Sequence, residues 1–380
     1  NRILGEAYFL RAWAYFYAVR LWGDVPLITN PQTSTSAPNF FPARSSQEEV
    51  YQLIVEDLMT AENAGLNWMN ANGRVSLAAV KSLLSKVYLT MAGFPLNKGA
   101  SHYQLAAAKA LEVIEYANAN SGQLGLFPTY KDVHLETKKN VLEHIFMLQN
   151  NVIVAGNPMT NMHPNFKPVT FAGPAGTGST VPTRQFYNSY EPGDLRAKDQ
   201  EGWFYTSYYT NGSGAPFQLG APYIFKHFNT IANGTAGVPG TRNNNLNVPL
   251  IRYAEVLLIY AEAQNEIGGP TQAAYDAVKK IRDRAQLTTP DLGTLDQSAF
   301  RELVWRERWH ELCYEFITWF DMVRLRKAYN ESTNSFENFV GHVNVSSNQP
   351  LQEKHLLFPI PRPEMQNNQN LQPQNPGYPM

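Results

Sequence analysis

The sequence predicts a mostly α-helical protein built from tetratricopeptide-like helical repeats, four helix pairs in all, with a large loop-rich insertion that carries little β structure. Two observations predict this class. Apolar residues recur with a helical period in eight segments that come in pairs. Between residues 121 and 248 this rhythm disappears, and Gly, Pro, Asn, Thr and aromatic residues take over. A chain of 380 residues with 43% hydrophobic content can also bury a sizeable core.

The helix pairs are predicted from small residues placed where two helices must approach closely. Ala254 and Ala261 lie on one predicted helix, Ala273 and Ala277 lie on the next, and a Gly-Gly-Pro stretch at residues 268–270 separates the two. Each pair leaves an apolar face for its neighbour to cover. We expect helices at residues 2–22, 47–64, 74–92, 102–119, 250–268, 271–286, 298–314 and 316–328.

The pattern favours one domain over residues 1–380 with four parts. The first helical-repeat half is expected at residues 1–120, the loop-rich ligand-facing region at 121–248, the second helical-repeat half at 249–330 and a C-terminal wrapping tail at 331–380. One strand is predicted in the loop-rich region, at residues 143–149. Loops of this length inside a compact protein are usually functional.

The end of the chain, residues 356–378, is rich in Pro and Asn and cannot form a central strand or the interior of a helix. We expect it to wrap the helices as extended chain and to act as a clasp. The side chains expected to be buried by it are Leu357, Phe358, Ile360 and Tyr378.

Charge and motif content exclude several classes of function. The net charge is -1, so the sequence does not predict the basic surface that binding a nucleic acid requires. No run of about 18 apolar residues predicts a membrane span, and no metal, phosphate-loop or calcium-loop motif is present, so no cofactor is expected. The single cysteine, Cys313, is interpreted as a buried small hydrophobe; a nucleophile would need a base such as His310 and a third member that the pattern does not supply.

Charged residues within the predicted helices are interpreted as scaffold. Arg252 with Glu255, and Glu262 with Glu266, are expected on helix faces, where they cap, pair or remain solvated. A salt bridge between residues 321 and 324 is expected to tie the last repeat to the tail. Paired carboxylates for glycoside hydrolysis would require a cleft between them, so no catalytic residue is assigned.

Four segments resemble the SusD/RagB family of outer-membrane nutrient-binding lipoproteins of Bacteroidetes. They occur in the family order across nearly the whole chain, and the first ends in the Gly-Asp-Val-Pro turn. The segments are residues 2–26, 251–263 with 277–285, 307–324, and 357–361 with 370–378.

This resemblance implies a non-catalytic protein for starch or another glycan, used in polysaccharide utilisation and nutrient uptake. It also implies a TonB-dependent, SusC-like outer-membrane transporter as partner. The expected location is the outward face of the outer membrane, with attachment only through a lipid anchor that is not in this chain.

The ligand site is expected in the loop-rich region, because aromatic rings stack on the apolar face of a sugar while Asn, Asp, Gln and Arg bond its hydroxyl rim. Two stretches compete, one selected by its position in the family and one by its aromatic content; residues 68–72, with a Trp and two Asn, form a smaller third candidate. Core packing beneath a long loop is the alternative for every one of them. The candidates are Asn157, Asn161, His163, Phe166, Phe171, Trp203, Tyr205 and Tyr208.

Two other classes of function remain open at this point. A protein-interaction scaffold, or a lid for a non-carbohydrate nutrient such as a peptide, would use the repeat surface and bind no glycan. A glycoside hydrolase would need two carboxylates across a cleft.

Overall fold

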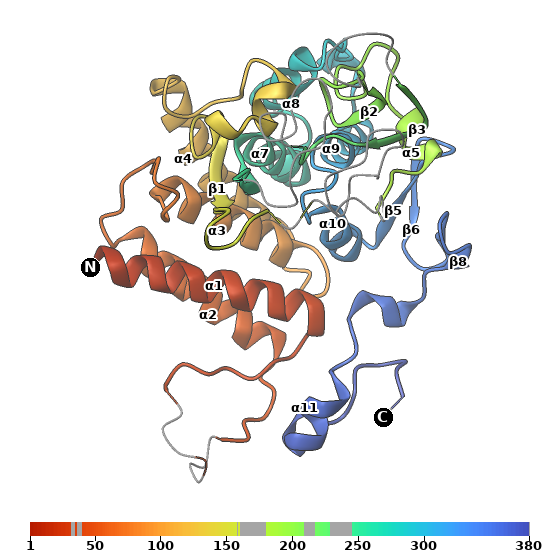
Figure 1. Ribbon diagram of the computed structural model, residues 1–380. Coiled ribbons are helices and arrows are strands. Elements are labelled where there is room, and N and C mark those ends of the chain that lie inside the picture. The colour runs from red at the N-terminus through yellow and green to blue at the C-terminus, as the bar shows by residue number, and fades with distance from the viewer. Residues whose placement is uncertain are drawn as a thin grey trace.

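The computed structural model describes residues 1–31, 35, 40–157, 159, 180–208, 217–228 and 245–379, with the side chains of residues 208 and 217 excepted. Eight long helices form the body (Figure 1). They match the eight predicted segments within a few residues, except that residues 250–252 belong to a strand. The helices are α1 (Arg2–Trp22), α2 (Gln47–Glu62), α3 (Leu77–Ala92), α4 (Ala100–Ala119), α7 (Tyr253–Gly268), α8 (Gln272–Arg284), α9 (Gln297–Glu311) and α10 (Thr318–Leu325).

Side-chain caps fix the starts of four of the eight helices. Ser46 forms a capping box with Glu49 at the start of α2. Ser76, Thr271 and Asp296 each accept a hydrogen bond from a backbone N–H in the first turn of α3, α8 and α9. These local signals make the helix positions readable from the sequence.

Helix α7 lies at the centre of the body, and nearly all of its residues are buried. It packs against α3 and α4 on one side and α8 and α9 on the other, and its alanines, including Ala254 and Ala261, are fully buried. One continuous hydrophobic core runs from α1 through α4 and on through α7 to α9. The mostly α, repeat-like architecture predicted from the sequence is confirmed.

The described strands form four separate two-stranded antiparallel sheets. The predicted strand at 143–149 is β1 (His144–Leu148), and its partner β4 (Val248–Arg252) leads directly into α7. This pairing places the two ends of the loop-rich region side by side. The other pairs are β2 (Phe204–Tyr208) with β3 (Phe217–Ile224), β5 (Lys327–Asn330) with β6 (Ser335–Asn338), and β7 (Val343–Asn344) with β8 (Gln349–Pro350).

The tail holds onto the body through Asn375. Its amide donates to the carbonyl oxygens of Trp22 and Phe358, and Arg44 donates to its side-chain oxygen. Ile360 is buried, and Leu357 and Tyr378 are half-buried. The prediction that Phe358 is buried was wrong: its ring is 45% exposed, because the backbone there runs against α1 while the ring faces solvent.

The tail also contains a short helix, α11 (Arg362–Asn367), where only extended chain was expected. A proline in its first turn is compatible with a helix start, since the missing N–H would have no partner there. Smaller elements are α5 (Arg184–Asn188) and the 3₁₀ turns η1 (Tyr130–His134), η2 (Glu136–Lys138), η4 (Leu292–Thr294), η5 (Glu353–Leu356) and η6 (Gln369–Leu371). None of the helices within the described ranges has the length and apolar character that crossing a membrane requires.

Candidate functional site

The end of strand β1 carries a cluster of side-chain amides. Gln149 and Asn140 exchange two hydrogen bonds, of 2.8 and 2.9 Å, and Asn247 donates to Gln149 at 2.7 Å. Gly73, from the loop between α2 and α3, lies against Gln149: a Cβ atom there would stand 2.3 Å from its Cδ. The amide of Gln149 therefore joins three segments that are far apart in the sequence.

A second group of amides fixes the chain that leaves β1. Asn150 and Asn157 both donate from their side chains to the carbonyl oxygen of Leu246 at 2.9 Å. The backbone N–H of Asn150 donates to Asn247 Oδ1 at 2.9 Å. Asn157, which was predicted to bind ligand, is buried and shapes the loop from below.

Exposed amides lie around this buried base. Asn72 and Asn151 are exposed, and Asn70 and Asn245 are half-buried. Asn70 Oδ1 accepts from the N–H of Asn72 within a local turn, and Asn245 Oδ1 accepts from the N–H of Val152 across the end of the β1–β4 pair. We name these four residues, Asn70, Asn72, Asn151 and Asn245, the amide ledge. Amide groups arranged in this way offer donors and acceptors that match hydroxyl groups.

Apolar side chains project next to the ledge. Residues 151–155 form a turn closed by backbone bonds between Asn151 and Ala155, and at its tip Ile153 and Val154 are 88% and 86% exposed. Large aliphatic side chains that are exposed next to one another often mark a surface that contacts another molecule.

The third sequence candidate, the segment around Trp68, lies in the same region. The indole of Trp68 stacks on the ring of Tyr116 from α4, with centroids 4.2 Å apart and an interplanar angle of 8°. Backbone bonds from residues 77 and 78 to the carbonyl oxygens of residues 67 and 68 hold the segment on the start of α3. The stack uses one face of the indole, so Trp68 supports the loop that carries Asn70 and Asn72.

The aromatic cluster selected by composition lies in the core. Trp203 and Tyr205 have no exposed surface. The indole N–H of Trp203 donates to the carbonyl oxygen of His310 at 2.9 Å, and Lys226 Nζ stands 3.8 Å from the ring centroid. The rings of Trp203 and Tyr205 thus present no face to a ligand, which corrects the expectation that they stack on a sugar. The alternative, core packing, describes them.

The remaining candidates are only partly described. Tyr208 ends strand β2, and its side chain lies outside the described part of the chain. Asn161, His163, Phe166 and Phe171 fall outside the described residues altogether. Their assignment to the ligand site stays a prediction.

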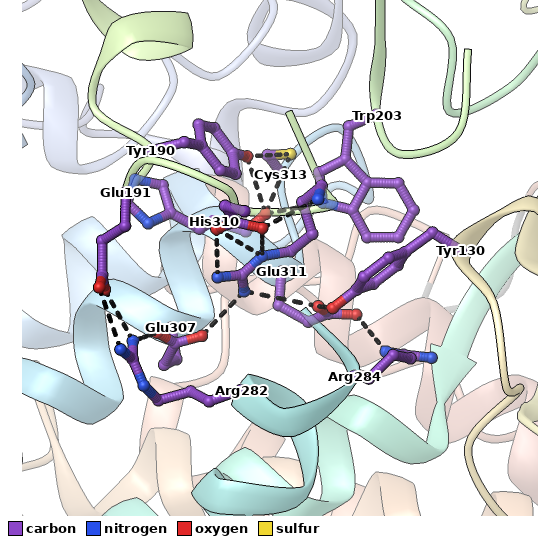
Figure 2. A network of polar contacts seen from close by, with 12 residues as sticks. Tyr130, Tyr190, Glu191, Trp203, Arg282, Arg284, Glu307, His310, Glu311 and Cys313 are labelled. Atoms are coloured by element: carbon purple, nitrogen blue, oxygen red, sulfur yellow. Dashed lines mark hydrogen bonds and ion pairs between the residues drawn. The ribbon is translucent and has the colours of Figure 1, made fainter. Parts of the chain in front are cut away.

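Beside the β1–β4 pair lies a network of buried ions that the sequence reasoning missed. Figure 2 shows the part of it around Glu307, Glu311 and Arg284. Arg252 binds three carboxylates: Glu143, Glu311 at 3.1 Å, and Glu315 at 2.7 Å. Arg284 joins Glu143 and Glu311 from the other side at 2.6 and 2.7 Å. All five side chains are buried. The network connects β1, β4, α8 and α9.

The network continues around Glu307. Arg196 and Arg282 both donate to its carboxylate, and Asp194 binds Arg196 in turn. Burial alone would raise the pKa of Glu307, but the two guanidinium groups outweigh it and hold the pKa at about 2. In the same way Arg252 and Lys226 hold the pKa of Glu315 at about 2. These carboxylates are buried and form ion pairs with cations, so they are not accessible to a substrate.

A smaller network lies between α7, α9 and α10. Arg324 binds Glu262 and Asp321, and Arg308 binds Asp321 at 2.9 Å. The expected bridge from Asp321 to Arg324 is present, but it links α10 to α7 and α9 rather than to the tail. Arg252, Glu255, Glu262 and Glu266 were expected to cap, pair or remain solvated, and all four pair with other charges. Arg252, Glu255 and Glu262 are buried, and Arg252 lies at the end of β4 and pairs with Glu143, Glu311 and Glu315.

Cys313 and His310 are buried beside the network around Glu307 and Glu311 (Figure 2), and neither is charged at neutral pH. Burial raises the pKa of the Cys313 thiol to about 11 and lowers the pKa of His310 to about 3. His310 Nε2 lies 2.9 Å from Ser189 Oγ, and the Cys313 thiol donates to the His310 carbonyl oxygen at 3.5 Å. The interpretation of Cys313 as a buried small residue is confirmed.

Comparisons with known proteins place the whole chain in one family. Residues 183–378 match the family described as the SusD family, and residues 1–89 match a family described as starch-binding and associating with the outer membrane. SusD-like protein P2 of Formosa agariphila is 29% identical, over 100% of this chain and 74% of that protein.

Solved structures agree with this assignment. A SusD superfamily protein from Parabacteroides distasonis is 36% identical and superimposes with a TM-score of 0.89, covering 100% of this chain and 79% of that one. Surface glycan-binding protein A of Bacteroides thetaiotaomicron shares the fold at 19% identity, with a TM-score of 0.72 over 98% of this chain and 77% of its own. This chain belongs to the SusD family.

Proposed function

We propose that this protein binds a glycan without catalysing its hydrolysis, at the outward face of the bacterial outer membrane. The observation that carries the proposal is family membership at both ends of the chain, together with the starch-binding description of the family matched by residues 1–89. The shared fold with a surface glycan-binding protein supports it further. The burial and pairing of the carboxylates in the ion networks support a non-catalytic role.

We place the ligand on the amide ledge. Its amides stand on a rigid base, because Asn150, Asn157 and Asn247 fix the chain beneath them. A side chain held in this way loses little conformational freedom when it bonds a hydroxyl. The segment that follows Asn157 in the sequence carries the remaining predicted residues, Asn161, His163, Phe166 and Phe171, and we retain them as candidates for stacking and hydroxyl bonding.

The expected affinity suits capture and release. Stacking one sugar face buries about 100 Å² of apolar surface, worth about 2.5 kcal/mol. Two such contacts, reduced by the cost of association, give dissociation constants on the order of micromolar to millimolar. A receptor that must hand its ligand on benefits from binding of this strength.

The partner in this proposal is a TonB-dependent, SusC-like transporter, and the precursor carries a lipid anchor. The outer-membrane association described for the family matched by residues 1–89 supports this location. The exposed Ile153 and Val154 beside the ledge offer apolar surface for a protein contact.

The test is affinity electrophoresis on a panel of polysaccharides, followed by calorimetry on the glycan that retards the protein. The variant Asn72→Ala/Asn151→Ala removes two exposed ledge amides, each of which contributes about 1 kcal/mol to a hydroxyl contact. We expect binding about tenfold weaker or more. The control, Gln52→Ala/Gln104→Ala, removes two exposed amides from α2 and α4 and should bind like the wild type.

Three outcomes would contradict the proposal. Release of reducing ends from the bound glycan would show a hydrolase. Equal binding by the ledge variant and its control would move the site away from the ledge. Failure of the wild type to bind any glycan of a panel spanning starch, mucin and plant polysaccharides would favour a lid or scaffold for another ligand.

A further inference from the structure

A cavity that shares no residue with the amide ledge lies between the end of α1, helix α10 and the tail. It has a volume of about 290 Å³, close to the lower end of pockets that hold small molecules. Most of its lining is apolar, with Val19, Phe94, Phe320, Leu356 and Leu357 among the walls. One lining residue, Arg20, carries a charge that its surroundings do not balance.

The guanidinium of Arg20 is held between two aromatic rings. Its Cζ lies 3.7 Å from the ring centroid of Phe16 and 3.8 Å from that of Phe320. Its Nε donates to the carbonyl oxygen of Phe16 at 2.8 Å. The ring centroid of Tyr17 lies 4.9 Å from Cζ as well, and the Tyr17 hydroxyl interacts with Arg20. The aromatic rings thus surround the guanidinium, and its Nη edge is the part that can bond a further acceptor.

No carboxylate among the described residues lies within ion-pair distance of Arg20. The nearest acidic groups that act on it are Glu255 and Asp321, and both already bind other cations: Glu255 pairs with Lys86 at 2.8 Å, and Asp321 with Arg324 at 2.8 Å. Burial lowers the pKa of Arg20, because these distant charges do not compensate for lost hydration.

The charged side chains around Arg20 include more cations than anions. The buried acidic groups are Glu255, Glu262 and Asp321, and the cations that face them are Lys86, Arg308, Arg324 and Arg20. Three negative charges thus meet four positive ones in the described structure. Arg20 is half-buried, and a cation that has lost part of its hydration and has no carboxylate partner favours an anion beside it.

Other polar groups of the cavity suit an anion as well. Lys354 lines it, and so does Arg326, whose Cζ lies 5.1 Å from the ring centroid of Phe94. Tyr51 contributes a hydroxyl that stays neutral, because burial raises its pKa. One carboxylate, Glu353, also lines the cavity, and it acts on Arg326 at the rim rather than on Arg20.

We propose that this cavity is a binding site for a small monocarboxylate with an apolar body, such as an arylacetic acid. The carboxylate bonds the Nη edge of Arg20 and completes the charge balance. The apolar body lies against Val19, Phe94 and the leucines of the tail. This site is separate from the amide ledge, and it uses a cation that the scaffold leaves unpaired.

Calorimetric titration with phenylacetate, and with its neutral isostere phenylacetamide, tests the proposal. We expect saturable binding of phenylacetate and binding of phenylacetamide about tenfold weaker or more, since a hydrogen bond to a charged partner is worth about 1.5 to 3 kcal/mol. Arg20→Gln should weaken phenylacetate binding by a similar factor. The control Arg74→Gln removes an exposed arginine that pairs with Glu6 and should leave binding unchanged.

A second variant keeps the test decisive if Arg20→Gln fails to fold. Leu356→Trp fills the cavity with a larger side chain and leaves Arg20 in place, so it should abolish phenylacetate binding. No heat from phenylacetate at millimolar concentration, equal binding of acid and amide, or wild-type binding by Leu356→Trp would each overturn the proposal.

Discussion

Arg252 offers the sharpest test of how the loop-rich region is held. It is fully buried and bonds the side chains of Glu143, Glu311 and Glu315 and the backbone of Glu311. The variant Arg252→Met keeps the length of the side chain and removes its charge and donors. Removing one partner of a buried ion pair costs about 3 to 5 kcal/mol, because the other partner stays buried without compensation.

The geometry places the expected cost in the lower half of that range. After the substitution Glu143 and Glu311 still bind Arg284, and Glu315 still binds Lys226. We therefore expect the free energy of unfolding to fall by about 3 kcal/mol. Urea unfolding followed by far-ultraviolet circular dichroism measures it. Arg74→Met is the control, since Arg74 is exposed and its pair with Glu6 contributes little to stability.

The pH dependence gives a second readout with a defined sign. The folded pKa of Glu315 is about 2, below its unfolded value of about 4.3. Its contribution to wild-type stability is therefore complete above pH 4.3 and is lost as the pH falls toward 2. Without Arg252 this pKa rises, so the difference between wild type and variant should stay constant above about pH 4.3 and shrink as the pH falls from about 4.3 toward 2. An Arg252→Met variant as stable as Arg74→Met at pH 7 would refute the reasoning.

Two further predictions concern the ledge and a buried histidine. Gly73→Ala should cost about 1 to 3 kcal/mol more stability than Gly65→Ala in urea unfolding, since both glycines have φ +74 but only at Gly73 would a Cβ clash, with Gln149; equal losses would contradict the contact. Burial lowers the pKa of His227 to about 4, so the contribution of His227 to stability should be full above pH 6.5 and fall by about 1.4 kcal/mol per pH unit toward pH 4, in addition to that of the other buried histidines, such as His310. His227→Gln should flatten that slope by one proton, measured by unfolding at pH 5 and pH 7, and an unchanged slope would assign the titration to another group.

The helices were predictable because their signals are local. The helical period of apolar residues and the small residues at close approaches each depend on only a few neighbouring positions. The caps that the structure shows, such as Ser46 and Asp296, are local as well. The strand β1 was predictable for the same reason, as a short apolar run. Its partner β4 was not predicted. The apolar residues of β4 continue the apolar pattern of α7, so residues 250–252 were assigned to the helix.

The buried charges were not predictable from one sequence. Arg252 and Glu143 are 109 positions apart, and spacing along a helix suggested instead that Arg252 pairs with Glu255. The same limit applied to Trp203 and Tyr205. Aromatic residues serve both as stacking platforms and as core, so composition could select the cluster but could not decide its burial.

The position of the ion network explains why a binding scaffold would contain one. A hydrophobic core orders the helices of the repeats, whereas the residues beside Arg196 and Lys226 pack in smaller hydrophobic clusters that are separate from that core. Ion pairs with directional hydrogen bonds fix such segments where burial alone would leave them free to shift. Through Glu143 and Arg252 the network holds both strands of the β1–β4 pair. The amide ledge stands at the end of that pair, so the charges beneath it set the position of the proposed binding surface.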